Sequence, residues 1–191
     1  LALPGLQGVV VTCPAGLEGD FAAVAPISPV PLDFVEGGAS RQGSVKRGLD
    51  ALLPSVRPAD IVLVHDAARC LAPTSLMEDL LRGVADGADA VIPALPVADT
   101  IKQVASDGEG EFVAETLDRA SLRAVQTPQA FRWEPLWDSH LQAVADADHE
   151  ESAATDDAAL VEAQGVAVRV IPGSPLAFKV TTSKDLNLLC E

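Results

Sequence analysis

Short runs of consecutive apolar residues alternate along the chain with segments whose apolar residues recur every three or four positions. The clearest run is Ile61–Val64, four large apolar residues that end abruptly at His65 and Asp66. Such a run is typical of a strand buried on both faces, as in a parallel sheet. Because ligands bind beyond the carboxyl ends of strands in open α/β sheets, residues 65–69 form a candidate site. A plain polar turn explains these residues equally well when they are taken alone.

The same pattern predicts an alternation of strands and helices. Val45, Leu49 and Leu52 are spaced so that they form one face of a helix. In chain order we expect strands at 8–12, 30–35, 61–64, 88–95, 166–171 and 179–182, and helices at 41–53, 75–84, 134–144, 155–164 and from 183 onward. This alternation favours an α/β fold with a mostly parallel sheet, right-handed crossovers and helices on both faces.

Two helix starts carry recognisable capping residues. Ser75 and Glu78 have capping-box spacing, and Thr155 is expected to cap a helix that begins with Asp156 and Asp157. Carboxylates at this end of a helix interact favourably with its dipole. Capping therefore explains the last three residues without a functional role.

A hairpin arm is expected in the middle of the chain. Residues 99–104 and 112–117 read as two strands around a turn at 107–108, and the arm is too short to enclose a core. It must lie along the sheet or pack on a partner subunit. The polar segment 126–131 that follows is expected to be extended, since Pro128 keeps the residue before it out of the helical region.

Composition and charge exclude several classes of protein. The 191 residues suffice for one domain with a full core, since 48% are hydrophobic. The net charge of −15 argues against extended contacts with nucleic-acid phosphates, although a few converging cations suffice for a nucleotide. Three scattered cysteines without CxxC spacing indicate a reducing compartment, with neither a disulfide framework nor a zinc site. Because we expect no signal peptide and no membrane-spanning run, we predict a cytoplasmic protein without a membrane partner.

The candidate chemistry is that of anions and hydroxyls. The three histidines lack metal-ligand spacing, and the sequence contains no GxSxG or GxGxxG pattern. The remaining polar candidates lie near predicted strand ends or on the arm. They are Arg41, Asp66, Arg69, Lys102, Arg119 and Lys179. This set suits phosphoryl or nucleotidyl transfer, in which positioning and charge neutralisation replace a protein nucleophile.

Six short motifs occur in order from about residue 36 to the end of the chain. They are Gly37-Gly38 with Arg41 and Ser44-Val45, Val64-His65-Asp66-Ala67-Ala68-Arg69, Pro96-Val97-Ala98-Asp99-Thr100-Ile101-Lys102, Gln126-Thr127-Pro128-Gln129, Thr155-Asp156 and Lys179-Val180-Thr181. Together they resemble the 2-C-methyl-D-erythritol 4-phosphate cytidylyltransferase family of the non-mevalonate isoprenoid pathway. The combination is specific, although no single motif is.

The resemblance implies a Rossmann-like nucleotidyltransferase fold for a single domain spanning residues 1–191. It also implies a β-arm at 96–131 that makes a homodimer. The implied partners are CTP and a polyol phosphate: the phosphate of methylerythritol phosphate attacks the α-phosphorus of CTP, giving the CDP-alcohol and pyrophosphate. Mg²⁺ on the triphosphate is the implied cofactor.

The roles of individual residues follow from the resemblance, motif by motif. Substrate contacts are implied for Thr100, Arg119, Thr127, Thr155 and Lys179, the first two reaching the site from the partner's arm. Nucleotide contacts are implied for Gly38, Ser44, Asp66 and Ala67. The implied catalytic residues are Asp66, Arg119 and Lys179, and Asp66 is also the implied metal ligand.

One expected part of the family pattern lies outside the sequence. The family's Gly-rich loop, whose Arg and Lys cradle the triphosphate, belongs upstream of Leu1, so we expect a longer protein rather than a degenerate relative. Two other functions stay open. The D-ribitol 5-phosphate cytidylyltransferases of cell-wall polymer synthesis share the HDAAR and Lys-Val-Thr elements, and a non-catalytic nucleotide-binding or scaffold protein would keep the dimer arm.

Overall fold

The computed structural model describes residues 3–143, 154–187 and 189, where the predicted alternation of strands and helices is present. In chain order the elements are β1 (Val9–Cys13), α1 (Glu18–Val24), β2 (Leu32–Glu36), α2 (Arg41–Leu52), β3 (Ile61–Val64), α3 (Thr74–Ala85), β4 (Ala90–Pro96), β5 (Lys102–Ser106), β6 (Glu111–Thr116), β7 (Arg123–Val125), β8 (Gln129–Arg132), α4 (Trp133–Gln142), α5 (Asp157–Ala163), β9 (Val168–Pro172) and α6 (Ser183–Asn187). Among these residues, no helix is long and apolar enough to cross a membrane.

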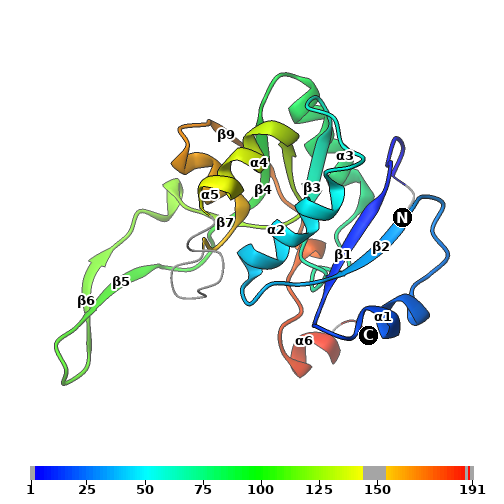
Figure 1. The fold of residues 1–191 in the computed structure, drawn as a ribbon. Helices are drawn as coiled ribbons and strands as arrows, with labels where there is room; N and C mark the ends of the chain where they lie inside the picture. The colour runs from blue at the N-terminus through cyan, green and yellow to red at the C-terminus, as the bar shows by residue number, and fades with distance from the viewer. Residues whose placement is uncertain (1–2, 144–153, 188, 190–191) are drawn as a thin grey trace.

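The main sheet is built around β4 (Figure 1). On one edge of β4 lies β9, paired in parallel; on the other edge lie β8 and then β7, both antiparallel to β4. β3 pairs antiparallel with β8. β3, β4 and β9 therefore run in the same direction, while β8 runs against them. β1 and β2 form a separate parallel pair.

Side chains of β4 alternate between two cores. Ala90 and Ile92 pack with residues of α2, α4 and α5, whereas Val91 packs with Leu80 and Val84 of α3. Helices thus cover both faces of the sheet, which confirms the predicted Rossmann-like α/β architecture. Leu80 is fully buried, so its replacement by Ala is expected to cost about 2–5 kcal/mol of folding stability.

The polar segment 126–131 contains a central strand. Gln129, Ala130 and Phe131 of β8 are all fully buried between β3 and β4. The predicted parallel strands β3 and β4 are therefore separated by an antiparallel strand that the hydrophobic pattern does not reveal. A glutamine is tolerated there because its amide is hydrogen bonded to Asp156 and Ala158 at the start of α5.

The arm projects from the body as the β5–β6 hairpin (Figure 1). Every residue of its two strands is exposed, and Gly108 adopts a positive φ of 89° in the turn. The projecting part is shorter than the predicted range 96–131, because β7 and β8 return to the main sheet. A two-stranded hairpin of this kind is marginally stable alone in water.

Both predicted helix caps are wrong in detail. α3 follows Pro73 and has no side-chain cap, so the pair Ser75 and Glu78 does not form a capping box. α5 is capped by Asp156, whose carboxylate accepts a hydrogen bond from the N–H of Ala159 at 3.0 Å. The cap therefore lies at Asp156, one residue later than predicted, because α5 begins at Asp157.

The C-terminal segment has one strand fewer than predicted. Residues 179–182 form no strand in the described structure, although α6 begins at Ser183 as expected. The Val180 N–H in this segment donates to the Ala68 carbonyl in the loop after β3 rather than to a strand. The predicted acidic loop at 146–151 lies outside the described residues.

Candidate functional site

Asp66 lies two residues after the end of β3, at the centre of a cluster of charges. The Lys179 Nζ atom lies 3.1 Å from Asp66 Oδ2, and the Arg41 Nε atom lies 3.1 Å from Asp66 Oδ1. Arg69 Nε lies 3.9 Å from Oδ2 of the same carboxylate. The structure therefore brings three predicted anion-handling residues to the strand end where the hydrophobic pattern indicates a site.

Thr127 fixes the backbone at this strand end. Its buried hydroxyl oxygen accepts a hydrogen bond from the Asp66 N–H at 3.0 Å and lies 3.1 Å from Nδ1 of His65. Thr127 lies in the short connection between β7 and β8, two strands that both pair with β4. Thr127, a predicted substrate residue, is thus a direct structural partner of Asp66.

The surrounding cations change the acidity of Asp66. Partial burial alone would raise the pKa of its carboxyl, but Arg41 and Lys179 outweigh that effect and hold the pKa below its ordinary value. Burial likewise would lower the pKa of Arg41, yet the carboxylates of Asp157 and Asp66 raise it. Asp66 is therefore ionised at neutral pH and only accepts hydrogen bonds.

The segment that carries Lys179 is attached to the loop after β3 by main-chain contacts. The N–H of Val180 donates to the carbonyl of Ala68 at 2.8 Å. Arg69 Nη1 donates to the carbonyl of Ala177 at 2.7 Å. Arg69 therefore anchors the lysine segment in addition to facing Asp66.

Gln126 fixes the turn that precedes this segment, a role that the sequence analysis missed. Gln126 is only 5% exposed. Its side-chain amide donates a hydrogen bond to the carbonyl of Ser174 at 2.8 Å and accepts one from the Ser174 N–H at 3.0 Å. A Cβ at Gly173 would clash with Gln126 Oε1, so a larger residue there would displace the Gln126 amide from Ser174. The sequence gives one sign of this role: Gln126 is a polar residue at the junction of two strands.

Gly38 and Ser44 are joined across the start of α2. The Ser44 hydroxyl accepts from the Gly38 N–H at 3.1 Å and donates to the Ser40 carbonyl at 2.8 Å. A Cβ on Gly38 would lie 2.5 Å from the carbonyl carbon of Gly43, so a side chain does not fit. The two residues implied in nucleotide binding thus form one structural unit, and that binding role stays a prediction.

A second carboxylate, Asp157, reaches the cluster from α5. Its Oδ2 lies 2.9 Å from Arg41 Nη2, and its Oδ1 lies 2.9 Å from His140 Nε2. Thr155, another predicted substrate residue, is exposed just before this helix. The sequence analysis assigned Asp157 to the helix start and gave His140 no role, because a pairing between separate helices leaves no local pattern.

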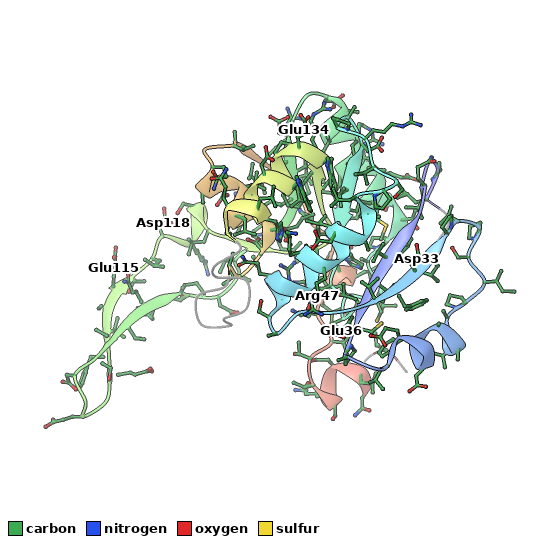
Figure 2. All side chains as sticks on the ribbon, viewed as in Figure 1. Asp33, Glu36, Arg47, Glu115, Asp118 and Glu134 are labelled. Carbon is green, nitrogen blue, oxygen red and sulfur yellow. The ribbon has the colours of Figure 1, made fainter. Side chains whose placement is uncertain are left out.

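Thr100 and Arg119 belong to the base of the arm instead. Both are exposed, and Arg119 Nη1 donates to the carbonyl of Ala98 at 2.5 Å. Figure 2 shows Asp118, the neighbour of Arg119, and Glu115 on the arm, away from the body. Within the described residues, no hydrogen bond or ion pair joins Thr100 or Arg119 to Asp66. The predicted site is therefore divided between the body and the arm.

The residues around Asp66 do not fit a resident Mg²⁺ ion. In the part of the chain that the structure describes, no group of three or more His, Cys, Asp or Glu side chains is arranged to hold a metal. The two oxygens of Asp66 face Arg41 and Lys179, whose charges oppose a divalent cation. Asp66 as a metal ligand stays a prediction that these ion pairs do not favour.

The fold and the site together define a class of protein. Helices cover both faces of an α/β sheet, and cations converge on a carboxylate beyond a strand end, where small residues leave room for a ligand. This is the arrangement of a Rossmann-like nucleotidyltransferase. A sequence model described as "IspD: 2-C-methyl-D-erythritol 4-phosphate cytidylyltransferase" matches residues 2–189. The chain belongs to the 2-C-methyl-D-erythritol 4-phosphate cytidylyltransferase family.

Individual relatives agree with this assignment. The 2-C-methyl-D-erythritol 4-phosphate cytidylyltransferase of Streptomyces avermitilis is 48% identical over 187 residues, 94% of this chain and 71% of the relative. That of Streptomyces coelicolor is 46% identical over 187 residues, 94% of this chain and 66% of the relative. The crystal structure of the Thermus thermophilus enzyme has a TM-score of 0.73 and 36% identity, covering 95% of this chain and 79% of that chain.

Proposed function

We propose that the full-length protein transfers the cytidylyl group of CTP to 2-C-methyl-D-erythritol 4-phosphate and releases pyrophosphate. The observation that carries the proposal is the convergence of Lys179 and Arg69 on Asp66 in a chain of this family. Two relatives and one solved structure bear the name of this activity, which favours methylerythritol phosphate over ribitol phosphate as the substrate.

The proposed reaction needs alignment and charge neutralisation rather than a protein nucleophile. A phosphate oxygen of the polyol phosphate attacks the α-phosphorus of CTP; the new O–P bond forms as the bond to the leaving pyrophosphate breaks. Lys179, whose side chain is 44% exposed, is free to turn from Asp66 toward a phosphate. Asp66 accepts hydrogen bonds from substrate hydroxyls, and Thr127 and Thr155 complete the pocket for the polyol phosphate.

Gly38, Ser44 and Ala67 are the proposed nucleotide contacts of the body. Small side chains before α2 and after β3 let a nucleotide approach the main chain closely. Mg²⁺ is proposed to enter on the triphosphate, where it neutralises negative charge. No residue of the chain is assigned to hold it.

A homodimer through the arm is the proposed assembly. Phe112 and Val113 on β6 are 56% and 60% exposed, which is unfavourable for apolar side chains in water. A second copy that covers the arm would place its own Thr100 and Arg119 near the polyol phosphate. We also propose a cytoplasmic enzyme without a nucleic-acid partner, supported by the charge of −15 and the unpaired Cys13 and Cys70.

Pyrophosphate release by the purified full-length protein tests the proposal. CTP and Mg²⁺ are supplied with either 2-C-methyl-D-erythritol 4-phosphate or D-ribitol 5-phosphate, and the Lys179→Ala variant serves as the inactive control. Strong preference for the first acceptor supports the proposal. Preference for ribitol phosphate would keep the chemistry and replace the substrate, whereas no release with either would support a non-catalytic nucleotide-binding protein.

A further inference from the structure

A line of charged and polar side chains leads from α4 to the candidate site. His140 Nε2 lies 2.9 Å from Asp157 Oδ1, and Asp157 Oδ2 lies 2.9 Å from Arg41 Nη2. Arg41 Nε then donates to Asp66 Oδ1 at 3.1 Å. The side chains of His140 and Asp157 are 0% and 1% exposed, so this end of the line is closed to water.

His140 is a fixed support for the Asp157 carboxylate. Because a carboxylate only accepts hydrogen bonds, the proton lies on Nε2, which donates to Asp157 Oδ1. Nδ1 of the same ring is buried and has no hydrogen-bond partner among the described residues. The imidazole therefore has one polar contact there, and that contact keeps the other carboxylate oxygen turned toward Arg41.

Arg41 occupies a position where the helix itself gains nothing from a cation. It is the first residue of α2, and the helix dipole disfavours positive charge at that end. Ser40 already caps the helix by accepting from the Gly43 N–H at 3.0 Å. The planar guanidinium instead faces two carboxylates at once, which a lysine ammonium does not do in a fixed geometry. The charge of Arg41 thus serves its two partners rather than α2.

We propose that Arg41 is a positioning residue of the transfer site: Asp157 and His140 fix its guanidinium, and the guanidinium fixes the Asp66 carboxylate with Oδ2 toward Lys179. The inference rests on the proposed function of the same site. In this role Arg41 acts through Asp66, because its Nε and Nη2 atoms are directed at Asp66 and Asp157. Without it, Oδ1 loses its ion-pair partner, and among the described residues the carboxylate is held only through Oδ2 by Lys179 and Arg69, while its backbone stays bonded to Thr127.

Steady-state kinetics of cytidylyl transfer by the full-length protein test this role. Arg41→Gln is expected to lower kcat/KM about 10²-fold, the scale of a misplaced reacting group; the melting temperature is also expected to fall, because the buried Asp157 carboxylate loses its cation. Arg41→Lys is expected to recover part of the loss, because it keeps the charge beside Asp66. A role confined to folding would lower the melting temperature but leave kcat/KM of the folded protein at the wild-type value.

Arg47→Gln is the matched control on the same helix. Arg47 pairs with Glu36 at 2.7 Å, and the two side chains are 47% and 50% exposed on the surface (Figure 2). A surface pair of this kind contributes little, so this variant is expected to keep wild-type kinetics.

A second measurement asks whether Arg41 acts through Asp66. In an Asp66→Asn background, Arg41→Gln is expected to cost little further activity, because the group it positions is already lost. Equal losses in both backgrounds, or wild-type activity of Arg41→Gln, would overturn the inference. If Asp66→Asn is too slow to measure, the partial rescue by Arg41→Lys decides. A wild-type protein without transfer activity would overturn the proposed function itself, and this inference with it.

Discussion

The Lys179 ammonium lies 3.1 Å from Asp66 Oδ2, so a carboxylate at the end of β3 holds a cation from the C-terminal segment. An ion pair with one partner 44% exposed contributes at most about 1 kcal/mol to folding. The ion pair therefore serves mainly to hold both side chains at the site. In the proposed reaction the lysine exchanges its carboxylate partner for a phosphate.

Lys179→Ala is accordingly expected to lower kcat/KM by about 10²–10³-fold, the usual cost of removing one group that stabilises transition-state charge. The melting temperature is expected to stay unchanged. Pyrophosphate release and a thermal melt measure the two quantities. Lys184→Ala, an exposed cation on α6, is the control and is expected to behave as the wild type. Equal effects of the two variants would contradict the assignment of Lys179.

Thr127 offers a test of how the strand end is held. Thr127→Val removes the buried acceptor of the Asp66 N–H and is expected to cost about 1–3 kcal/mol of folding stability, together with activity. Thr127→Ser keeps the hydroxyl and is expected to retain most of both. Urea unfolding and initial rates compare the two variants. A valine variant as stable as the serine variant would show that the hydrogen bond is dispensable.

Much of this fold is readable from local pattern. The apolar run Ile61–Val64 and the helical spacing of Val45, Leu49 and Leu52 identify β3 and α2, because each pattern depends only on neighbours in the sequence. The strand β8 is not readable in this way. Its polar Gln129 is buried only because α5 supplies hydrogen-bond partners from a distant part of the chain.

The site shows the same division. Asp66 and Lys179 are identifiable because each belongs to a short motif at the end of an apolar run or segment. The support of Arg41 by Asp157 and His140 is not, since it joins three helices and each residue has an ordinary local explanation. Long-range pairing of buried polar groups is therefore where the sequence analysis fails.

Gly38 provides a steric test of the loop before α2. In Gly38→Ala the new Cβ would lie 2.5 Å from the Gly43 carbonyl carbon, so the loop must move, at a cost of about 1–3 kcal/mol. We expect a lower melting temperature and a raised KM for CTP. Gly19→Ala is the control: its Cβ would meet nothing within 4 Å, and alanine in α1 is expected to stabilise by about 0.5–1 kcal/mol. Equal melting temperatures for the two variants would rule out the steric account.

Asp185 gives a pH test of the segment that follows Lys179. Its carboxylate accepts hydrogen bonds from the N–H and hydroxyl groups of Thr181 and Thr182, which lower its pKa to about 2. A depressed pKa means that this contribution to stability is present above the ordinary value of 3.8 and is lost as pH falls toward about 2. Carboxyl-carbon NMR is expected to give a midpoint near 2, and Thr182→Ala is expected to raise it. A wild-type midpoint at 3.8 would refute the hydrogen-bond account.

The division of the predicted site between body and arm leads to a complementation experiment. Arg119→Ala removes a cation from the arm, and Lys179→Ala removes one from the body; each homodimer alone is expected to be nearly inactive. If each site combines one body with the partner's arm, a mixed dimer carries one site with both lesions and one site with neither. Random mixing of subunits is then expected to restore about a quarter of wild-type activity.

The mixing experiment requires subunits that exchange, so the two variants are unfolded together and refolded before the assay, with each variant refolded alone as its control. Sedimentation velocity establishes whether the wild-type protein is a dimer. Replacing Phe112 and Val113 by Ser removes apolar surface from the exposed arm and is expected to shift the protein toward the monomer. Restored activity in the mixture would place Arg119 in the partner's site. A dimer whose mixed variants stay inactive would place Arg119 and Lys179 in the site of the same subunit.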